Sequence, residues 1–166
     1  MAKKANTHTI SLLVANKPGV LIRCAQVFAR RGFNIDSLVV SASINPKYSR
    51  MTLTAQGDPS TLGQIIKQSA KLIDVINAEE HDEKKTITRE YALLKIKTTG
   101  QTKAAIKKLA VQHKAKIIDE EDKRLIIEQA GTTEQLDTFE EKVKKYGILE
   151  MVRSGKLAMA RGLEET

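Results

Sequence analysis

The sequence has no tryptophan, only three phenylalanines and three tyrosines, and a single cysteine among its 166 residues. One cysteine cannot form a disulfide within the chain, and without a neighbouring histidine Cys24 is a poor candidate nucleophile. No apolar run approaches the roughly 20 residues that a membrane-spanning helix needs. The first residues carry lysines without the apolar segment of a signal peptide, so we expect a cytoplasmic protein.

Groups that could catalyse a reaction or bind a metal are also scarce. The three histidines, His8, His81 and His113, lie far apart, and none has a partner at the spacing of metal ligands. Acidic residues cluster only where solvent-exposed segments are expected, at 79–83, 119–122, 140–141 and 164–165. No nucleophile stands beside a base. We therefore expect a chain without catalytic residues, metal or cofactor.

The net charge of +8 raises the question of nucleic acid, because a basic surface attracts phosphate whatever its sequence. The 28 lysines and arginines are spread along the chain and mixed with 20 acidic residues, which is typical of a solvated surface. Arg31, Gly32 and Phe33 begin the signature of an RNA-recognition strand, but Asn34 and Ile35 follow in place of its next residues. With few aromatic side chains on which bases could stack, RNA binding is kept only as an alternative.

The first half of the chain alternates between strand and helix patterns. Residues 9–14 alternate between apolar and polar side chains, which predicts a half-buried strand, and helical spacing follows. The apolar residues are Ile10, Leu12 and Val14 in the strand and Val20, Leu21, Cys24, Val27 and Phe28 in the helix. Pro18 suits the first helical turn and Gly32 a left-handed C-terminal cap. A second strand is expected over 33–43.

Turn signals divide the rest of this half. A turn at 45–46 precedes a third strand over 51–55. Asp58 and Pro59 mark the start of a second helix, with the aspartate as N-cap and the proline at the first helical position. The buried stripe of this helix is expected to be Leu62, Ile65, Ile66, Ser69 and Leu72. A fourth strand is expected over 73–78.

The same order recurs in the second half. Strand patterns cover 91–97, 115–118, 125–129 and 148–152. A helix is expected around 105–110, and Thr132 with Gln135 predicts a capping box for another. The inward side chains of that last helix are expected to be Leu136, Phe139 and Val143. The chain thus predicts an α+β protein of two tandem ferredoxin-like βαββαβ domains, each an antiparallel sheet with two helices on one face.

A polar run at 79–85 contains no apolar residue and indicates the boundary between the domains. We expect a first domain over 1–80, a linker over 81–87 and a second domain over 88–166. Each sheet has one face that its own helices leave open, and sheet edges recruit partners, so at least a homodimer is expected. The side chains expected on open faces or edges are Thr52, Thr54, Tyr91 and Leu93.

The turn before the first helix could hold a carboxylate. The free N–H groups of a helix's first turn attract anions, and Gly19 allows a ligand to approach the backbone closely. Asn16 adds an amide that can donate and accept. An ordinary strand-to-helix turn with asparagine as a cap explains the same local pattern. Both readings are open on local pattern alone.

Longer motifs distinguish these readings. They are Asn16-Lys-Pro-Gly19-Val-Leu, Phe28-x-Arg-Arg-Gly-Phe-Asn34-Ile-Asp-Ser-Leu38, Ser49-Arg-Met-Thr52, Gln64-Ile-x-Lys67-Gln68, Lys71-Leu-Ile-Asp-Val75, Arg89-Glu90, Gln129-x-Gly131-Thr132, Arg153-Ser-Gly155 and Arg161-Gly162. In this combination the chain resembles the small, regulatory subunits of acetolactate synthase, also called acetohydroxyacid synthase. The likeness covers nearly the whole chain and is densest up to about residue 76.

The resemblance implies that the first domain is an ACT domain, which pairs with a second copy and binds amino acids between the two. The implied effector is valine or another branched-chain amino acid. Its binding residues would be Asn16, Lys17, Pro18, Gly19, Val20 and Leu21 of one subunit with Asn34 and Ile35 of the other. Pro18 stands where some members carry a polar residue, which removes one backbone donor.

The resemblance also implies a non-catalytic subunit with a large catalytic partner. That partner would carry thiamine diphosphate, Mg²⁺ and FAD and would condense pyruvate with pyruvate or 2-oxobutyrate. The small subunit would activate it and confer feedback inhibition. An alternative is a stand-alone ACT-type sensor that regulates another enzyme or transcription.

Overall fold

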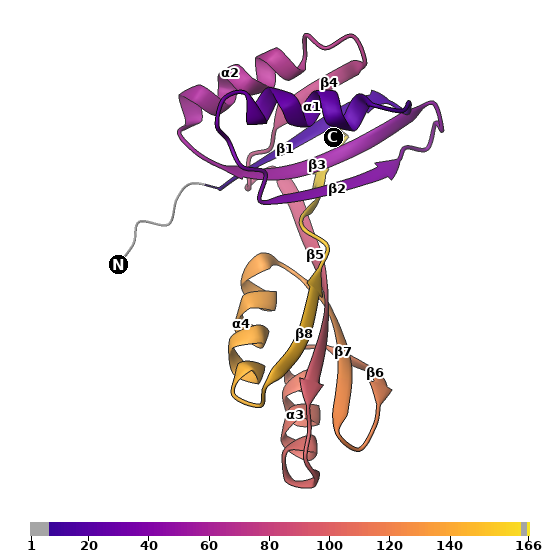
Figure 1. Cartoon of the computed structure of the whole chain (residues 1–166), viewed down its shortest axis with the longest axis vertical. Coiled ribbons are helices and arrows are strands. Elements are labelled where there is room, and N and C mark those ends of the chain that lie inside the picture. The colour runs from indigo at the N-terminus through magenta and orange to yellow at the C-terminus, as the bar shows by residue number, and fades with distance from the viewer. Residues whose placement is uncertain (1–6, 164–165) are drawn as a thin grey trace. The chain divides into compact units, whose positions relative to one another are not determined.

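A computed structural model describes residues 7–163 and 166 of the chain (Figure 1). These residues form two compact units. The first unit holds the described residues up to Thr88 together with those from Gly155 onward, and the second spans Arg89–Ser154. No helix in the described part is long and apolar enough to cross a membrane.

The first unit is an antiparallel sheet with two helices on one face (Figure 1). Its elements are β1 (Thr7–Ala15), α1 (Val20–Ala29), β2 (Ser37–Ala42), β3 (Tyr48–Gln56), α2 (Pro59–Ser69) and β4 (Val75–Glu80). The four strands lie in the order β2-β3-β1-β4, which confirms the predicted ferredoxin-like arrangement. In the core, Leu12 and Leu53 of the sheet belong to one buried cluster with Phe28 of α1 and Leu62 of α2.

Helix α1 ends at the glycine that the sequence marks. Gly32 has a φ of +71°, where a side chain is strained. Its N–H donates to the carbonyl of Ala29 at 3.0 Å, and the N–H of Phe33 donates to the carbonyl of Phe28 at 3.1 Å. These two bonds form a Schellman motif, so the predicted cap is confirmed. Because Phe33 turns back to the helix in this way, β2 begins only at Ser37.

The start of α1 differs from the prediction. The first helical residue is Val20, and Gly19 occupies the N-cap with a φ of +83°. Pro18 therefore lies before the helix and not in its first turn. The left-handed backbone at Gly19 separates the proline from the helical conformation, which pattern alone could not show.

Helix α2 begins as predicted. The carboxylate of Asp58 accepts hydrogen bonds from the backbone N–H groups of Ser60 and Thr61, both at 3.0 Å. Pro59 occupies the first turn, where its missing N–H costs nothing. These hydrogen bonds lower the pKa of Asp58, with that from the Thr61 hydroxyl contributing most.

The second unit repeats the plan. Its elements are β5 (Thr86–Lys97, which begins in the first unit), α3 (Gly100–Gln112), β6 (Lys116–Glu120), β7 (Arg124–Gly131), α4 (Thr133–Lys144) and β8 (Ile148–Arg153). The strand order is β6-β7-β5-β8. The predicted capping box of α4 is present, with Thr132 and Gln135 bonding each other's backbone. The inward residues of α4 are buried as predicted, namely Leu136, Phe139 and Val143.

The division of the chain differs from the expected one at its C-terminal end. The tail from Gly155 onward groups with the first unit, where the sequence predicts that it belongs to the second domain. A short strand that the sequence did not reveal, β9 (Leu157–Ala160), pairs with β5. Beside it the N–H of Arg161 donates to the carbonyl of Lys85 at 2.8 Å. A strand this short gives too little alternation to be recognised, and its partner is distant in sequence.

The expected linker over 81–87 is likewise part of the first unit. Its middle forms a turn in which the N–H of Lys85 donates to the carbonyl of Asp82 at 3.0 Å, and β5 already begins at Thr86. The chain passes between the units inside the continuous strand β5, after Thr88. A charged run in this chain therefore marks a turn.

Some of the side chains that were expected on open sheet faces or edges are buried. Thr52 and Thr54 point away from the helices, yet they are only 5% and 4% exposed. Their strand neighbours on this face, Val39 and Ser37, contact Gly155 of the tail. The tail thus covers part of the face that the sequence suggested for a partner.

Candidate functional site

The turn between β1 and α1 is held by backbone contacts to its neighbours. The N–H of Asn16 donates to the carbonyl of Lys47 at 2.8 Å, and its side-chain Nδ2 donates to the carbonyl of Pro46 at 3.0 Å. Asn16 therefore ties the turn to the loop between β2 and β3. Its side-chain N–H group therefore has a structural role, and the side-chain oxygen takes no part in these two hydrogen bonds.

Gly19 opens α1 without a side-chain cap. The N-cap glycine has no side chain that could bond the amides of the helix start, and these amides form the positive end of the helix dipole. A Cβ added at Gly19 would lie 3.1 Å from Nη1 of Arg23, and its φ of +83° disfavours any side chain. The local geometry thus suits the close approach of an anionic group.

The other residues of the predicted site fall into different environments. Lys17 and Pro18 are exposed in the turn, and Leu21 projects outward at 42% exposure. Val20 is only 2% exposed and packs in the core of the first unit. Val20 therefore anchors the turn to the hydrophobic core. The resemblance grouped Val20 with the contact residues because its motif covers the whole turn from Asn16 to Leu21.

Asn34 and Ile35 lie beyond the opposite end of α1. Asn34 is exposed, and its Nδ2 donates to Oδ1 of Asp36 at 3.1 Å, while Ile35 packs partly against the core. Helix α1 has ten residues and is therefore about 15 Å long. One chain does not bring Asn34 to Gly19, so a site that uses both requires a second copy.

Two residues beside the turn escaped sequence analysis. Arg23, one helical turn after Gly19, places its Nη2 at 2.5 Å from Oδ2 of Asp74. Asp74 also accepts a hydrogen bond at its backbone carbonyl from the N–H of Ala15 at 2.8 Å. The spacing of Arg23 from Gly19 was the available signal, whereas the position of Asp74 follows only from the fold.

Arg23 also borders a shallow groove between α1 and α2. The groove has a volume of about 270 Å³ and is lined by Arg23, Gln26, Val27, Arg30, Gln68 and Leu72. Its residues come from α1 and its C-cap, from the C-terminal end of α2 and from the loop after α2. Its lining mixes guanidinium and amide groups with two aliphatic side chains.

Cysteine and histidine take structural positions in the described residues. Burial raises the pKa of the Cys24 thiol, which keeps it protonated. His8 pairs with Glu80, and Nε2 of His81 lies 2.6 Å from the hydroxyl of Ser11. Burial lowers the pKa of His81. Residues 7–163 and 166 contain no group of three or more His, Cys, Asp or Glu residues that could hold a metal ion.

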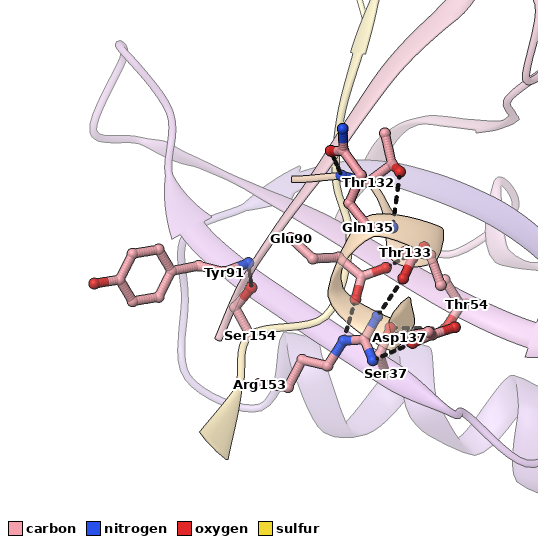
Figure 2. Close-up of polar contacts among 10 residues, drawn as sticks. All are labelled: Ser37, Thr54, Glu90, Tyr91, Thr132, Thr133, Gln135, Asp137, Arg153 and Ser154. Atoms are coloured by element: carbon pink, nitrogen blue, oxygen red, sulfur yellow. Dashed lines mark hydrogen bonds and ion pairs between the residues drawn. The ribbon is translucent and has the colours of Figure 1, made fainter. Parts of the chain in front are cut away.

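The second unit contains a charged network at the ends of β5 and β8. Figure 2 shows the Arg153 guanidinium pointing to the carboxylates of Glu90 and Asp137, with Nε 2.5 Å from Glu90 and Nη1 2.7 Å from Asp137. Glu90 is 5% exposed and also accepts a bond from the Thr133 hydroxyl. Burial alone would lower the pKa of Arg153, but Asp137 and Glu90 raise it above its ordinary value. The network therefore connects strands β5 and β8 to helix α4.

Comparison with known proteins gives matches over both units. A family model described as an AHAS small subunit-like ACT domain matches residues 10–77, and one described as the small subunit of acetolactate synthase matches residues 89–162. The acetolactate synthase small subunit of Mycolicibacterium smegmatis is 41% identical over 162 residues, which cover 98% of this chain and 95% of that protein. A probable acetolactate synthase small subunit of Archaeoglobus fulgidus is 41% identical over 155 residues, covering 93% and 97%.

A solved structure agrees with these sequence matches. The crystal structure of the acetolactate synthase small subunit from Thermotoga maritima matches with a TM-score of 0.87 and 36% identity, over 95% of this chain and 98% of that one. An ACT domain followed by a second ferredoxin-like unit defines the class of ACT-containing regulatory proteins. Within that class, the chain belongs to the family of acetolactate synthase small subunits.

Proposed function

We propose that this chain is the regulatory subunit of acetolactate synthase. It binds the large catalytic subunit, raises its activity and makes it sensitive to valine or another branched-chain amino acid. The observation that carries the proposal is the 41% identity with a small subunit over 98% of this chain. An ACT domain whose first helix starts without a side-chain cap at Gly19 supports the effector part of the proposal.

The chemistry belongs to the partner in this proposal. Thiamine diphosphate, Mg²⁺ and FAD are carried by the large subunit, which condenses pyruvate with a second 2-oxoacid. This chain has no catalytic role and acts in the cytoplasm with that soluble enzyme. Its contribution is to change the energy of the partner's active conformation.

The effector site is completed by a homodimer of ACT domains. The turn from Asn16 to Leu21 of one chain binds the carboxylate and ammonium groups of the amino acid, with Val20 fixing the turn from the core. Asn34 and Ile35 come from a second copy. The support is geometric, because the length of α1 separates Asn34 from Gly19 within one chain.

An effector at a dimer interface acts by differential binding. It stabilises the interface geometry to which it binds best, and the large subunit responds to that geometry. Such coupling is typically worth about 1–3 kcal/mol, equivalent to about a 5–150-fold change in apparent affinity. That range suffices for graded feedback inhibition.

Reconstitution with the large subunit of the same organism tests this function. We expect the chain to raise the rate of acetolactate formation from pyruvate and valine to lower the reconstituted rate. Gly19→Asp should abolish the valine effect, because it puts a carboxylate where the effector's must bind. Gly162→Asp is the matched control, since Gly162 has a similar φ of +78° with open space around it. No change in rate on adding the chain would contradict the proposal.

A further inference from the structure

The helix layer of the first unit, which comprises α1, α2 and the loop residues beside them (15–35 and 59–73), carries charge of one sign. It contains no aspartate and no glutamate. All of its cationic side chains are exposed, namely Lys17, Arg23, Arg30, Arg31, Lys67 and Lys71. Like charges gathered on one layer repel one another, so the isolated chain gains no stability from placing them there. A partner that brings negative charge would offset this repulsion.

The chain itself neutralises only part of this charge. Nη2 of Arg23 lies 2.5 Å from Oδ2 of Asp74, and Nη1 of Arg31 donates to the neutral side chain of Gln64 at 3.2 Å. In the part of the chain that the structure describes, the remaining cations of the layer form no ion pair, namely Lys17, Arg30, Lys67 and Lys71. Their charge is therefore available to a partner.

The second unit shows that the ferredoxin-like fold does not require a helix layer without acidic residues. There Lys103 and Lys107 of α3 both pair with Glu120, at 2.9 and 2.7 Å. Its other helix, α4, carries acidic residues of its own, namely Glu134, Asp137, Glu140 and Glu141. The positive charge of the first unit's helix layer is therefore a property of its sequence and not of the fold.

The groove between α1 and α2 lies within this helix layer, because all of its lining residues belong to the layer. Two guanidinium groups, those of Arg23 and Arg30, line it together with two amides and two aliphatic side chains. Ile22 and Ile73 of the same layer are 63% and 98% exposed. Protein interfaces combine arginine with apolar side chains in this way, whereas phosphate backbones are bound by cationic and polar groups. The layer thus favours a protein partner over nucleic acid.

We propose that the helix layer of the first unit binds an acidic surface of the large catalytic subunit. This assignment rests on the proposed function and deepens it by naming the contact surface. A symmetric contact with a second copy does not suit the layer, because it would place the same cations opposite one another. Arginine suits the carboxylates of a protein partner, which accept two parallel N–H bonds from one guanidinium. Helix α1 also begins at the turn of the candidate effector site, so one helix joins that site to this surface.

Lys67 and Lys108 provide a matched comparison. Lys67 lies in α2 and Lys108 in α3, both are exposed, and neither forms an ion pair among residues 7–163 and 166. Changing either lysine to glutamate alters the net charge of the protein by the same amount, but only Lys67→Glu alters the helix layer. Arg30→Glu is a second variant within the layer, at a residue that lines the groove.

The test measures the rate constant with which the full-length protein associates with the large subunit of the same organism. It is made at about 0.1 M and about 1 M NaCl, between which the Debye length falls from about 10 Å to about 3 Å. The wild-type rate constant should be at least about tenfold higher at the lower salt concentration. At that concentration Lys67→Glu and Arg30→Glu should each lower it about tenfold, whereas Lys108→Glu should keep the wild-type value.

The contrary outcomes are distinct. If the wild-type protein binds and activates the large subunit but Lys67→Glu and Arg30→Glu associate at the wild-type rate, this inference is overturned while the proposed function stands. If Lys108→Glu slows association equally, overall charge is responsible and the inference is likewise overturned. No binding of the large subunit by the wild-type protein would contradict the proposed function itself, and this surface with it.

Two further measurements complete the test. If the wild-type protein shifts an RNA duplex in a gel, and Lys67→Glu abolishes that shift but leaves association with the large subunit unchanged, the layer binds nucleic acid and the inference is overturned. Should the glutamate variants fail to fold, Lys67→Gln and Arg30→Gln remove the charge without reversing it and should each lower the rate constant about threefold. Unchanged rate constants in both glutamine variants would overturn the assignment.

Discussion

Gly155 of the tail packs against Ser37 of β2 so closely that a Cβ on the glycine would lie 2.8 Å from the Cβ of Ser37. Gly155 also has a φ of +81°, so both the contact and the backbone require a glycine. Ser37 bonds the hydroxyl of Thr54 at 2.7 Å and follows Asn34 closely in the chain. The C-terminal tail thus contacts the strand that begins next to a candidate effector residue.

Gly155→Ala should therefore destabilise the first unit by about 2–5 kcal/mol, combining a strained backbone with overpacking. Gly162→Ala has a similar backbone conformation, with a φ of +78°, but nothing within 4 Å, so it should cost only about 1–2 kcal/mol. Urea denaturation of both variants measures the difference. Equal midpoints would show that the contact with Ser37 contributes nothing.

Arg153→Ala should be among the most damaging single changes in the second unit. It leaves the carboxylate of Glu90, 5% exposed, without its cation, and breaking a buried pair costs about 3–5 kcal/mol. Lys95→Ala removes the half-buried partner of the exposed Glu150 on the same sheet and should have little effect. Denaturant midpoints of the two variants check the contrast, and a small loss in Arg153→Ala would refute the assigned role of the network.

Gly63→Ala should stabilise the protein. Gly63 lies inside α2, and a Cβ there would meet nothing within 4 Å. Alanine in a helix interior gains roughly 0.5–1 kcal/mol over glycine, because the unfolded chain loses freedom. Thermal unfolding should shift upward, and an unchanged or lower midpoint would show that the site is less open than the structure indicates.

Acid should weaken the fold through His81. Burial lowers its pKa, Glu79 partly opposes the shift, and Arg50 adds to it. The unfolded chain then binds the proton more readily, so this contribution to stability is complete above the ordinary pKa of about 6.5 and is lost as pH falls through and below it. His81→Asn should flatten the change in urea midpoint between pH 8 and pH 5.

His113 is the companion variant for that experiment. Burial and then Lys142 lower its pKa in the same direction, so His113→Asn should remove a separate share of the pH dependence. A pH profile identical to wild type in both variants would exclude the histidines as its source.

Local chemistry explains which parts of the fold could be predicted. Asp58, Gly32 and the pair Thr132 and Gln135 mark helix ends through contacts within a few residues, so the sequence contains the whole signal. The ferredoxin-like order of strands follows from the same alternation of elements. The left-handed Gly19 shifted the start of α1 by only two residues from the expected turn at Pro18.

Long-range contacts explain what was missed. β9 pairs with a strand some seventy residues earlier in the chain, and the Arg23–Asp74 pair joins a helix to a distant loop. Neither relationship leaves a periodic pattern. Among the predicted site residues, Gly19 and Asn16 form one turn, Val20 enters the core, and Asn34 lies beyond the far end of α1. A site shared between two copies cannot be assembled from one chain.

The most direct test of the account is a calorimetric titration of the full-length protein with valine, leucine, isoleucine and glutamate. We predict saturable binding of at least one branched-chain amino acid, no binding of glutamate, and loss of binding in Asn34→His. Asn77→His, at another exposed asparagine of the same unit, should bind like wild type. Unchanged binding in Asn34→His, or no binding of any branched-chain amino acid by the wild-type protein, would contradict the interface effector site.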